Sequence, residues 1–149
     1  MDNQTFLAHA VKLELDAEEI YLKAASLMKD QANRDAAAFF REMADFSRMH
    51  RETAMVRAGF STMADIPGDI ALWPGSNTES PDPKDFDKPL DLDAAMALAL
   101  AAEQRGVSFY EEIARTTTDP QTRLLAEEYA EEERGHVVAL ERFMGIAAY

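Results

Sequence analysis

Apolar residues recur at intervals of three and four along two early stretches of the chain, residues 3–30 and 33–58. Neither stretch contains a glycine or a proline, and both are rich in Ala, Leu, Met, Glu and Lys. Because an α-helix has about 3.6 residues per turn, this spacing gathers the apolar side chains on one helical face. We therefore expect two long helices, and the polar residues at 29–34 predict a tight turn between them.

The same pattern returns in the second half of the chain, over residues 92–115 and 119–144. Asp119 and Pro120 mark the start of the last stretch, since aspartate caps a helix N-terminus and proline suits the first helical position. A short polar turn separates the two stretches. A second pair of antiparallel helices is therefore predicted.

Residues 60–90, between the two helical pairs, hold five of the six prolines of the chain. Proline interrupts helices, so this segment is predicted to be a connection. A loop longer than about 15 residues is uncommon inside a compact domain unless the topology requires it. A crossover along a four-helix bundle of ferritin-like connectivity meets that requirement. We expect one all-α domain over residues 1–149. Its crossover is expected to pack on the bundle or on a second subunit through four apolar residues: Ile66, Ile70, Leu72 and Trp73.

The first helix of each pair carries a glutamate and a tyrosine seven residues apart, Glu14 with Tyr21 and Glu103 with Tyr110. Residues seven apart lie on one helical face, two turns from each other. Both glutamates share that face with apolar residues, so we expect them to point into the core. The two tyrosines are predicted either to hydrogen-bond the carboxylates or simply to pack beside them.

The second helix of each pair carries a histidine on its apolar face, His50 and His136. In the tetrapeptide ERGH, Glu133 precedes His136 by three residues, which brings a carboxylate and an imidazole within reach of a single ion. Buried carboxylates need a counter-charge, and a metal cation supplies one. The candidate ligands are Glu14, His50, Glu103, Glu133 and His136.

The composition of the chain further restricts the partners and ligands that are expected. Fifteen basic and twenty-eight acidic residues give a net charge of -13, which disfavours binding to nucleic acid or to an anionic membrane surface. The chain has no cysteine, so thiol catalysis and Cys-ligated metals are excluded and any metal must be held by Glu, Asp or His. No apolar run approaches the roughly 18 residues of a membrane span, and the N-terminus lacks a signal pattern, so a cytoplasmic location is expected.

The two Glu-x6-Tyr helices, the ERGH motif, the inward histidine and the long crossover together resemble the rubrerythrin branch of the ferritin-like di-iron carboxylate proteins, over essentially the whole chain. The resemblance implies that each hairpin supplies one glutamate and one Glu-x-x-His, with two carboxylates bridging two irons. It further implies a homodimer that acts in oxidative stress by reducing peroxide or dioxygen. The implied cofactor is iron, one or two per chain, with manganese or zinc left open.

Two positions depart from that family pattern, and the absence of cysteine is a third departure. Ser47 stands where the second bridging glutamate is expected, so a one-metal site using only the ligands of the second hairpin is the alternative. Glu18, one turn after Glu14, is a candidate for the missing charge, and a surface position is the alternative. Gly106 replaces an additional carboxylate, and the lack of cysteine excludes the small iron domain of full-length rubrerythrins, so a separate electron donor is required.

Two other functions compete with the redox hypothesis. One is ferritin-like oxidation or storage of iron, and the other is a metal-free bundle that binds a partner through Trp73 or its acidic surface. His9 lies about 140° around its helix from Glu14 and is predicted to be a surface residue. Four large side chains are predicted to serve only in packing: Phe39, Phe46, Met96 and Phe143.

Overall fold

The structure of the protein, a computed structural model, describes residues 2–66 and 81–145. Its elements are α1 (Asn3–Asp30), α2 (Arg34–Ala58), η1 (Met63–Asp65), η3 (Pro83–Phe86), α3 (Leu92–Thr116) and α4 (Pro120–Met144). The described residues contain no strand, and the bounds of the four long helices differ from the predicted bounds by one residue at most. The predicted all-α class is therefore confirmed. None of the described helices combines the length and apolar character that a membrane crossing requires.

Local chemistry explains where the helices begin and end. The Asp91 carboxylate accepts a hydrogen bond from the backbone of the first turn of α3, and Asp119 does the same for α4, which has Pro120 near its start. These contacts satisfy backbone N–H groups that have no partner inside the helix. Helices α2 and α4 end at Gly59 and Gly145, whose positive φ angles of 79° and 77° suit glycine.

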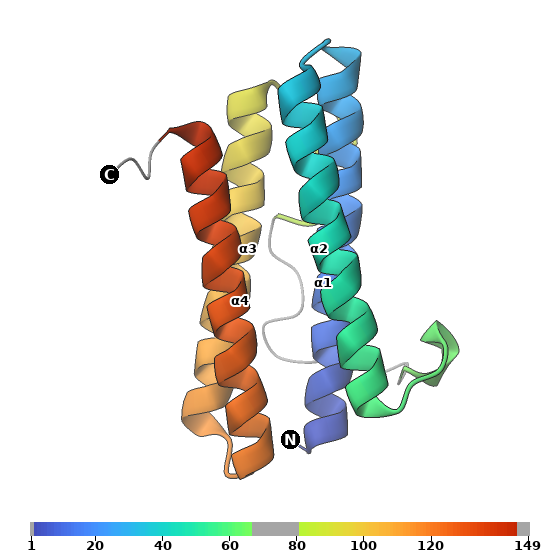
Figure 1. Ribbon diagram of the computed structural model, residues 1–149, viewed down its shortest axis with the longest axis vertical. Helices are drawn as coiled ribbons and strands as arrows, with labels where there is room; N and C mark the ends of the chain where they lie inside the picture. The colour runs from blue at the N-terminus through green and yellow to red at the C-terminus, as the bar shows by residue number, and fades with distance from the viewer. Residues whose placement is uncertain (1, 67–80, 146–149) are drawn as a thin grey trace.

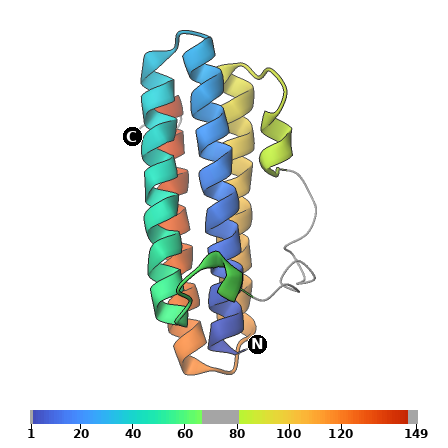
Figure 2. The same cartoon turned by 90° about the vertical axis from the view of Figure 1, so that its right-hand side faces the viewer.

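The four helices form a bundle of two antiparallel hairpins (Figure 1). Helix α1 packs on α2 and α3 packs on α4, while α1 lies beside α3 and α2 lies beside α4 (Figure 2). Helices α2 and α3 run in the same direction, so the chain between them must return along the whole bundle. This is the predicted ferritin-like connectivity, in which one long crossover joins two hairpins.

The described parts of the crossover attach to the bundle near α1. Lys23 Nζ lies 2.6 Å from Asp87 Oδ1, and it also donates a hydrogen bond to the Pro83 carbonyl. Phe86 and Ile66 pack against the apolar core, Phe86 fully and Ile66 in part. The other residues predicted to hold the crossover, Ile70, Leu72 and Trp73, lie outside the described residues.

The core consists of two apolar clusters with a polar layer between them. One cluster includes Met28 of α1 and Met96 of α3, and the other includes Phe6 of α1 and Tyr110 of α3. The buried residues that separate them along the helices are polar or charged: Glu14, Ser47, Glu103, Glu133 and His136. The fold therefore brings the chemically active positions together at mid-bundle.

One prediction about α1 is wrong. His9 is only 3% exposed, although its position on the helix predicted a surface residue. Helix α1 is contacted by α2, α3, α4 and η3, so more than one of its faces is covered. Burial lowers the pKa of His9 to about 4, which keeps the imidazole neutral at physiological pH.

Candidate metal centre

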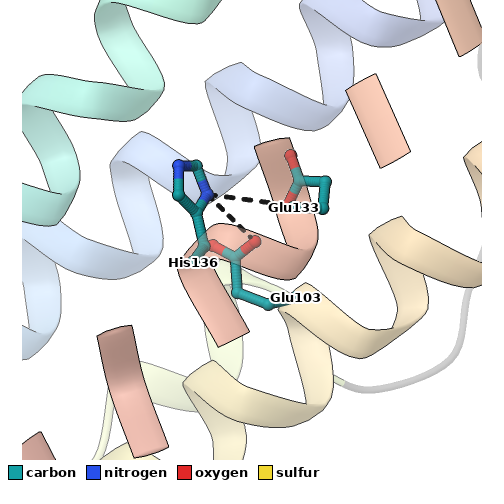
Figure 3. A group of neighbouring side chains, drawn as sticks. All are labelled: Glu103, Glu133 and His136. Carbon is teal, nitrogen blue, oxygen red and sulfur yellow. Dashed lines mark hydrogen bonds and ion pairs between the residues drawn. The ribbon is translucent and has the colours of Figure 1, made fainter. Parts of the chain in front are cut away.

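Three side chains of the second hairpin converge in the polar layer, Glu103 from α3 and Glu133 and His136 from α4 (Figure 3). The Nδ1 atom of His136 lies 3.3 Å from Glu103 Oε2 and 3.7 Å from Glu133 Oε2. Bonds from a metal to such donors are about 2.0–2.2 Å long, so two donors on one ion are at most about 4.4 Å apart. All three residues are buried, and their spacing fits a single metal ion.

The first hairpin brings Glu14 and His50 to the same layer. Glu14 is 5% exposed, and its Oε1 atom lies 3.9 Å from His50 Nδ1. The His50 ring stacks on the His136 ring with 5.2 Å between centroids and 8° between planes. The five residues predicted as ligands therefore lie in one layer, in which His50 is the most accessible, and three of them, Glu103, Glu133 and His136, are close enough together to hold one ion.

Gly106 makes room for this group. A β-carbon placed at Gly106 would lie 3.3 Å from Glu133 Oε2 and 3.4 Å from its carboxyl carbon. A glycine inside a helix costs about 1 kcal/mol relative to alanine, but here it opens the space that the Glu133 carboxylate uses. A β-carbon at this position would therefore require the Glu133 carboxylate to move by a few tenths of an ångström.

The centre is rich in negative charge. Among the described residues, neither lysine nor arginine forms an ion pair with Glu14, Glu103 or Glu133, whose ionic partners are His50 and His136. Burial and the charge of Glu133 raise the pKa of Glu103 to about 8 and hold the pKa of Glu14 well above its ordinary value. In the absence of a metal ion, bound protons compensate part of the charge.

Glu133 and His136 are the charged pair within the centre. Burial acts to raise the pKa of Glu133, but hydrogen bonding with Glu103 and His136 outweighs burial and lowers it. Burial acts to lower the pKa of His136, and its contacts with Glu103 and Glu133 outweigh that effect and raise it to about 10. A bound cation would replace the protons on His136 and on the raised carboxyl groups, so metal binding is expected to release protons.

The two repeat-related tyrosines behave differently. Tyr21 donates a hydrogen bond of 2.6 Å to Glu103 Oε1, and both groups are buried. The hydroxyl of Tyr110 is also buried but has no hydrogen-bond partner among the described residues. Tyr21 of one hairpin therefore orients a carboxylate of the other hairpin, whereas the corresponding contact from Tyr110 is missing.

A small cavity of about 30 Å³ borders the centre between α1 and α3. Its wall includes both tyrosines, two carboxylates and the helical glycine: Tyr21, Tyr110, Glu103, Glu133 and Gly106. A buried water needs about 10–15 Å³ measured in this way, so the cavity holds only very small molecules.

Ser47 and Glu18 occupy different surroundings. Ser47 is fully buried in the polar layer, and its hydroxyl has no hydrogen-bond partner among the described residues. The Glu18 carboxylate lies 2.7 Å from Arg51 Nη2 in a largely buried ion pair. The hypothesis that Glu18 supplies the charge missing at Ser47 is therefore not supported, because Arg51 already neutralises it.

The structure adds two residues that sequence reasoning missed. Glu132, which is not among the predicted ligands, is half-buried, and its Oε2 atom lies 3.6 Å from His50 Nδ1. A signal was present, since Glu132 precedes His136 by four residues and so shares its helical face. Phe46, predicted to serve only in packing, is 36% exposed and stacks on the His136 ring at 6.3 Å.

The fold and the buried carboxylate–histidine group define a ferritin-like bundle with a candidate metal centre. The sequence profile of the rubrerythrin family matches residues 5–144, so the chain belongs to the rubrerythrin family. Members of this family typically bind iron. No curated protein matches the chain.

Two solved structures are similar to the whole chain. An uncharacterized conserved protein from Magnetospirillum magnetotacticum is 31% identical, with a TM-score of 0.78, and the match covers 96% of this chain and 93% of that one. A hypothetical protein from Pyrococcus furiosus is 18% identical, with a TM-score of 0.56 and coverage of 99% and 90%. The second likeness supports the fold alone.

Proposed function

We propose that the protein is a non-haem iron protein that reduces peroxide or dioxygen with electrons from a separate donor. The observation that carries the proposal is the convergence of three buried carboxylates and two imidazoles between two apolar clusters, with no lysine or arginine among their described ion-pair partners. Carboxylate and imidazole donors suit iron, and also manganese or zinc. Iron bound there would supply the redox couple that passes electrons to the oxidant.

The residues of the chain have distinct tasks in this function. Glu103, Glu133 and His136 hold the metal, and the hydroxyl of Tyr21 keeps the Glu103 carboxylate in one orientation. The apolar clusters on either side limit access of water to the layer. The cavity of about 30 Å³ has room for a few water-sized molecules, which is compatible with a small oxidant as the substrate.

The test is anaerobic loading of the metal-free protein with Fe²⁺, followed by elemental analysis and a peroxide-consumption assay. We expect one to two irons per chain, and we expect Glu133→Gln to lose iron. Glu131→Gln is the matched control, because Glu131 is exposed and pairs with Arg134 on the outer side of the same helix. Iron content below one per chain in the wild-type protein would refute the proposal.

Iron oxidation beyond site stoichiometry and thermal unfolding with added metal separate the two competing functions. A storage protein would continue to oxidise Fe²⁺ well beyond the number of sites and would form a mineral. A metal-free bundle would have a thermal midpoint that is indifferent to added metal, whereas a ligand of the folded state at 100 times its Kd adds about 2.7 kcal/mol to the free energy of unfolding.

A further inference from the structure

We propose that Phe46 of α2 is a positioning residue of the metal centre, whose ring holds the His136 imidazole in its orientation towards the two carboxylates of the centre. This inference rests on the proposed function, because it takes His136 as a metal ligand. It gives a role to a side chain that helical periodicity assigns to packing alone.

The Phe46 ring lies nearly parallel to the imidazole. The centroids of the Phe46 and His136 rings are 6.3 Å apart, and the angle between the ring planes is 20°. The His50 ring, one helical turn further along α2, stacks on the same imidazole at 5.2 Å and 8°. Offset, nearly parallel rings at such separations attract one another. Two rings of α2 therefore restrict how the His136 side chain can turn.

Hydrogen bonding alone does not fix this imidazole in the metal-bound protein. A histidine that binds a metal usually has its ring orientation set by a further contact that does not involve the metal-binding nitrogen. The hydrogen-bond contact of His136 within the described residues is made by Nδ1, which lies 3.3 Å from Glu103 Oε2 on the side of the candidate ligands. A metal ion would take this nitrogen, so that contact cannot hold the ring once the ion is bound. The ring contacts remain, and Phe46 supplies one that does not come from a candidate ligand.

Core packing does not account for the position of Phe46. The residue is 36% exposed, and it belongs to neither of the two apolar clusters of the described chain. Apolar burial stabilises a fold in proportion to the area removed from water, so a partly exposed phenylalanine contributes less than a buried one. The contact with His136 is therefore the feature that distinguishes this ring.

A second ring pair on the same two helices provides a comparison. Phe39 lies seven residues before Phe46 on α2, and Phe143 lies seven residues after His136 on α4. The Phe39 and Phe143 rings stack at 4.4 Å with 18° between their planes, and both residues pack against an apolar cluster. Helices α2 and α4 are antiparallel (Figure 2), so the two pairs occupy equivalent places two turns apart along the interface. One pair serves the core, and the other includes a candidate ligand.

The test is titration of the metal-free full-length chain with Co²⁺, followed by calorimetry and visible absorption. We expect Phe46→Leu to weaken Co²⁺ binding roughly tenfold and to change the absorption bands of the bound ion, because it removes a group that orients a ligand. Phe46→Tyr keeps the ring and should bind as the wild type does. Phe39→Leu is the matched control, since it removes the equivalent ring from the core and should lower the thermal midpoint without changing the affinity.

The metal-free chain gives a second readout. The imidazole protons of His136 lie beside the Phe46 ring, so we expect its ring current to shift their NMR signals in the wild type and in Phe46→Tyr. In Phe46→Leu this shift should be smaller, and carbon relaxation should report a less ordered imidazole. An imidazole that is equally ordered in Phe46→Leu and in the wild type would overturn the inference without any metal present.

The outcomes separate this inference from the proposed function. If Phe46→Leu folds and binds Co²⁺ with the affinity and spectrum of the wild type, Phe46 does not position His136, while the proposed metal centre stands. An equal loss of affinity in Phe39→Leu would also overturn the inference, because the effect would then be a general loosening of the bundle. A wild-type chain that binds no Co²⁺ would overturn the proposed function and this inference with it. Thermal unfolding in EDTA shows that each variant folds, and Phe46→Met, which also lacks a flat ring, takes the place of Phe46→Leu if that variant is unfolded.

Discussion

Gly106 and Gly135 are a matched pair for testing how the metal centre depends on the space around Glu133. Both lie inside helices, Gly106 in α3 and Gly135 in α4. A methyl group added at Gly106 would lie 3.3 Å from Glu133 Oε2, whereas one added at Gly135 would meet nothing within 4 Å. The two alanine substitutions make the same chemical change, but only Gly106→Ala crowds a proposed ligand.

The magnitudes follow from helix propensity and from ligand geometry. Alanine in place of a helical glycine stabilises a helix by about 0.8–1.0 kcal/mol. We expect Gly135→Ala to gain this amount, which corresponds to about 2–4 °C in Tm. In Gly106→Ala, Glu133 must shift by a few tenths of an ångström. Metal sites tolerate deviations of about 0.2 Å in ligand distance, so we expect Co²⁺ binding to weaken roughly tenfold.

Two measurements check this prediction. Thermal unfolding in EDTA reports the stability of the metal-free variants, and calorimetric titration with Co²⁺ reports their metal affinity. Gly135→Ala should raise the thermal midpoint and bind Co²⁺ as the wild type does. If Gly106→Ala binds Co²⁺ as tightly as Gly135→Ala, the carboxylate of Glu133 does not hold the metal in the way proposed here.

Four further substitutions test other parts of the structure. Tyr21→Phe removes the hydrogen bond to Glu103 and should lower the free energy of unfolding by about 1–3 kcal/mol. Tyr110→Phe removes a hydroxyl that has no hydrogen-bond partner among the described residues and should not lower it. Urea unfolding in EDTA measures both variants. The pKa of His9 is lowered from 6.5 to about 4 in the folded state, so stability is lost as the pH falls through this interval. The free energy of unfolding should fall by up to about 1.4 kcal/mol per pH unit over this interval, and His9→Gln should make this dependence weaker. Parallel pH profiles of the wild type and the variant would contradict the lowered pKa of His9. Ser47→Glu restores the carboxylate of the family pattern and should strengthen metal binding at the second metal position of that pattern. An unchanged Co²⁺ affinity in this variant would contradict that expectation.

Helical periodicity was sufficient to place most of the centre before any tertiary contact was known. Glu14, Glu103, Glu133 and His136 each lie on an apolar face, and all four are buried. The rise and twist of an α-helix are nearly constant, so the spacing of residues in the sequence converts directly into direction. The structure then shows that these directions meet in one layer.

The sequence-based predictions were wrong or incomplete for residues whose surroundings depend on contacts with a second helix. His9 is buried because α1 is covered on more than one side, and this cannot be inferred from a single amphipathic pattern. Glu18 is neutralised by Arg51 of α2, and Glu132 contacts His50 of the same helix. Each of these contacts depends on how two helices are aligned along their lengths, which local spacing does not contain.

The sequence by itself determined the four helices, their caps and the inward direction of the buried glutamates, because these depend on interactions within one or two helical turns. Only the tertiary structure decided that α2 lies against α4 with His50 beside Glu132, and that Arg51 takes the charge of Glu18. The physical reason is that the alignment of packed helices is set by the fit of many side chains across the interface. That fit exists only in the folded bundle.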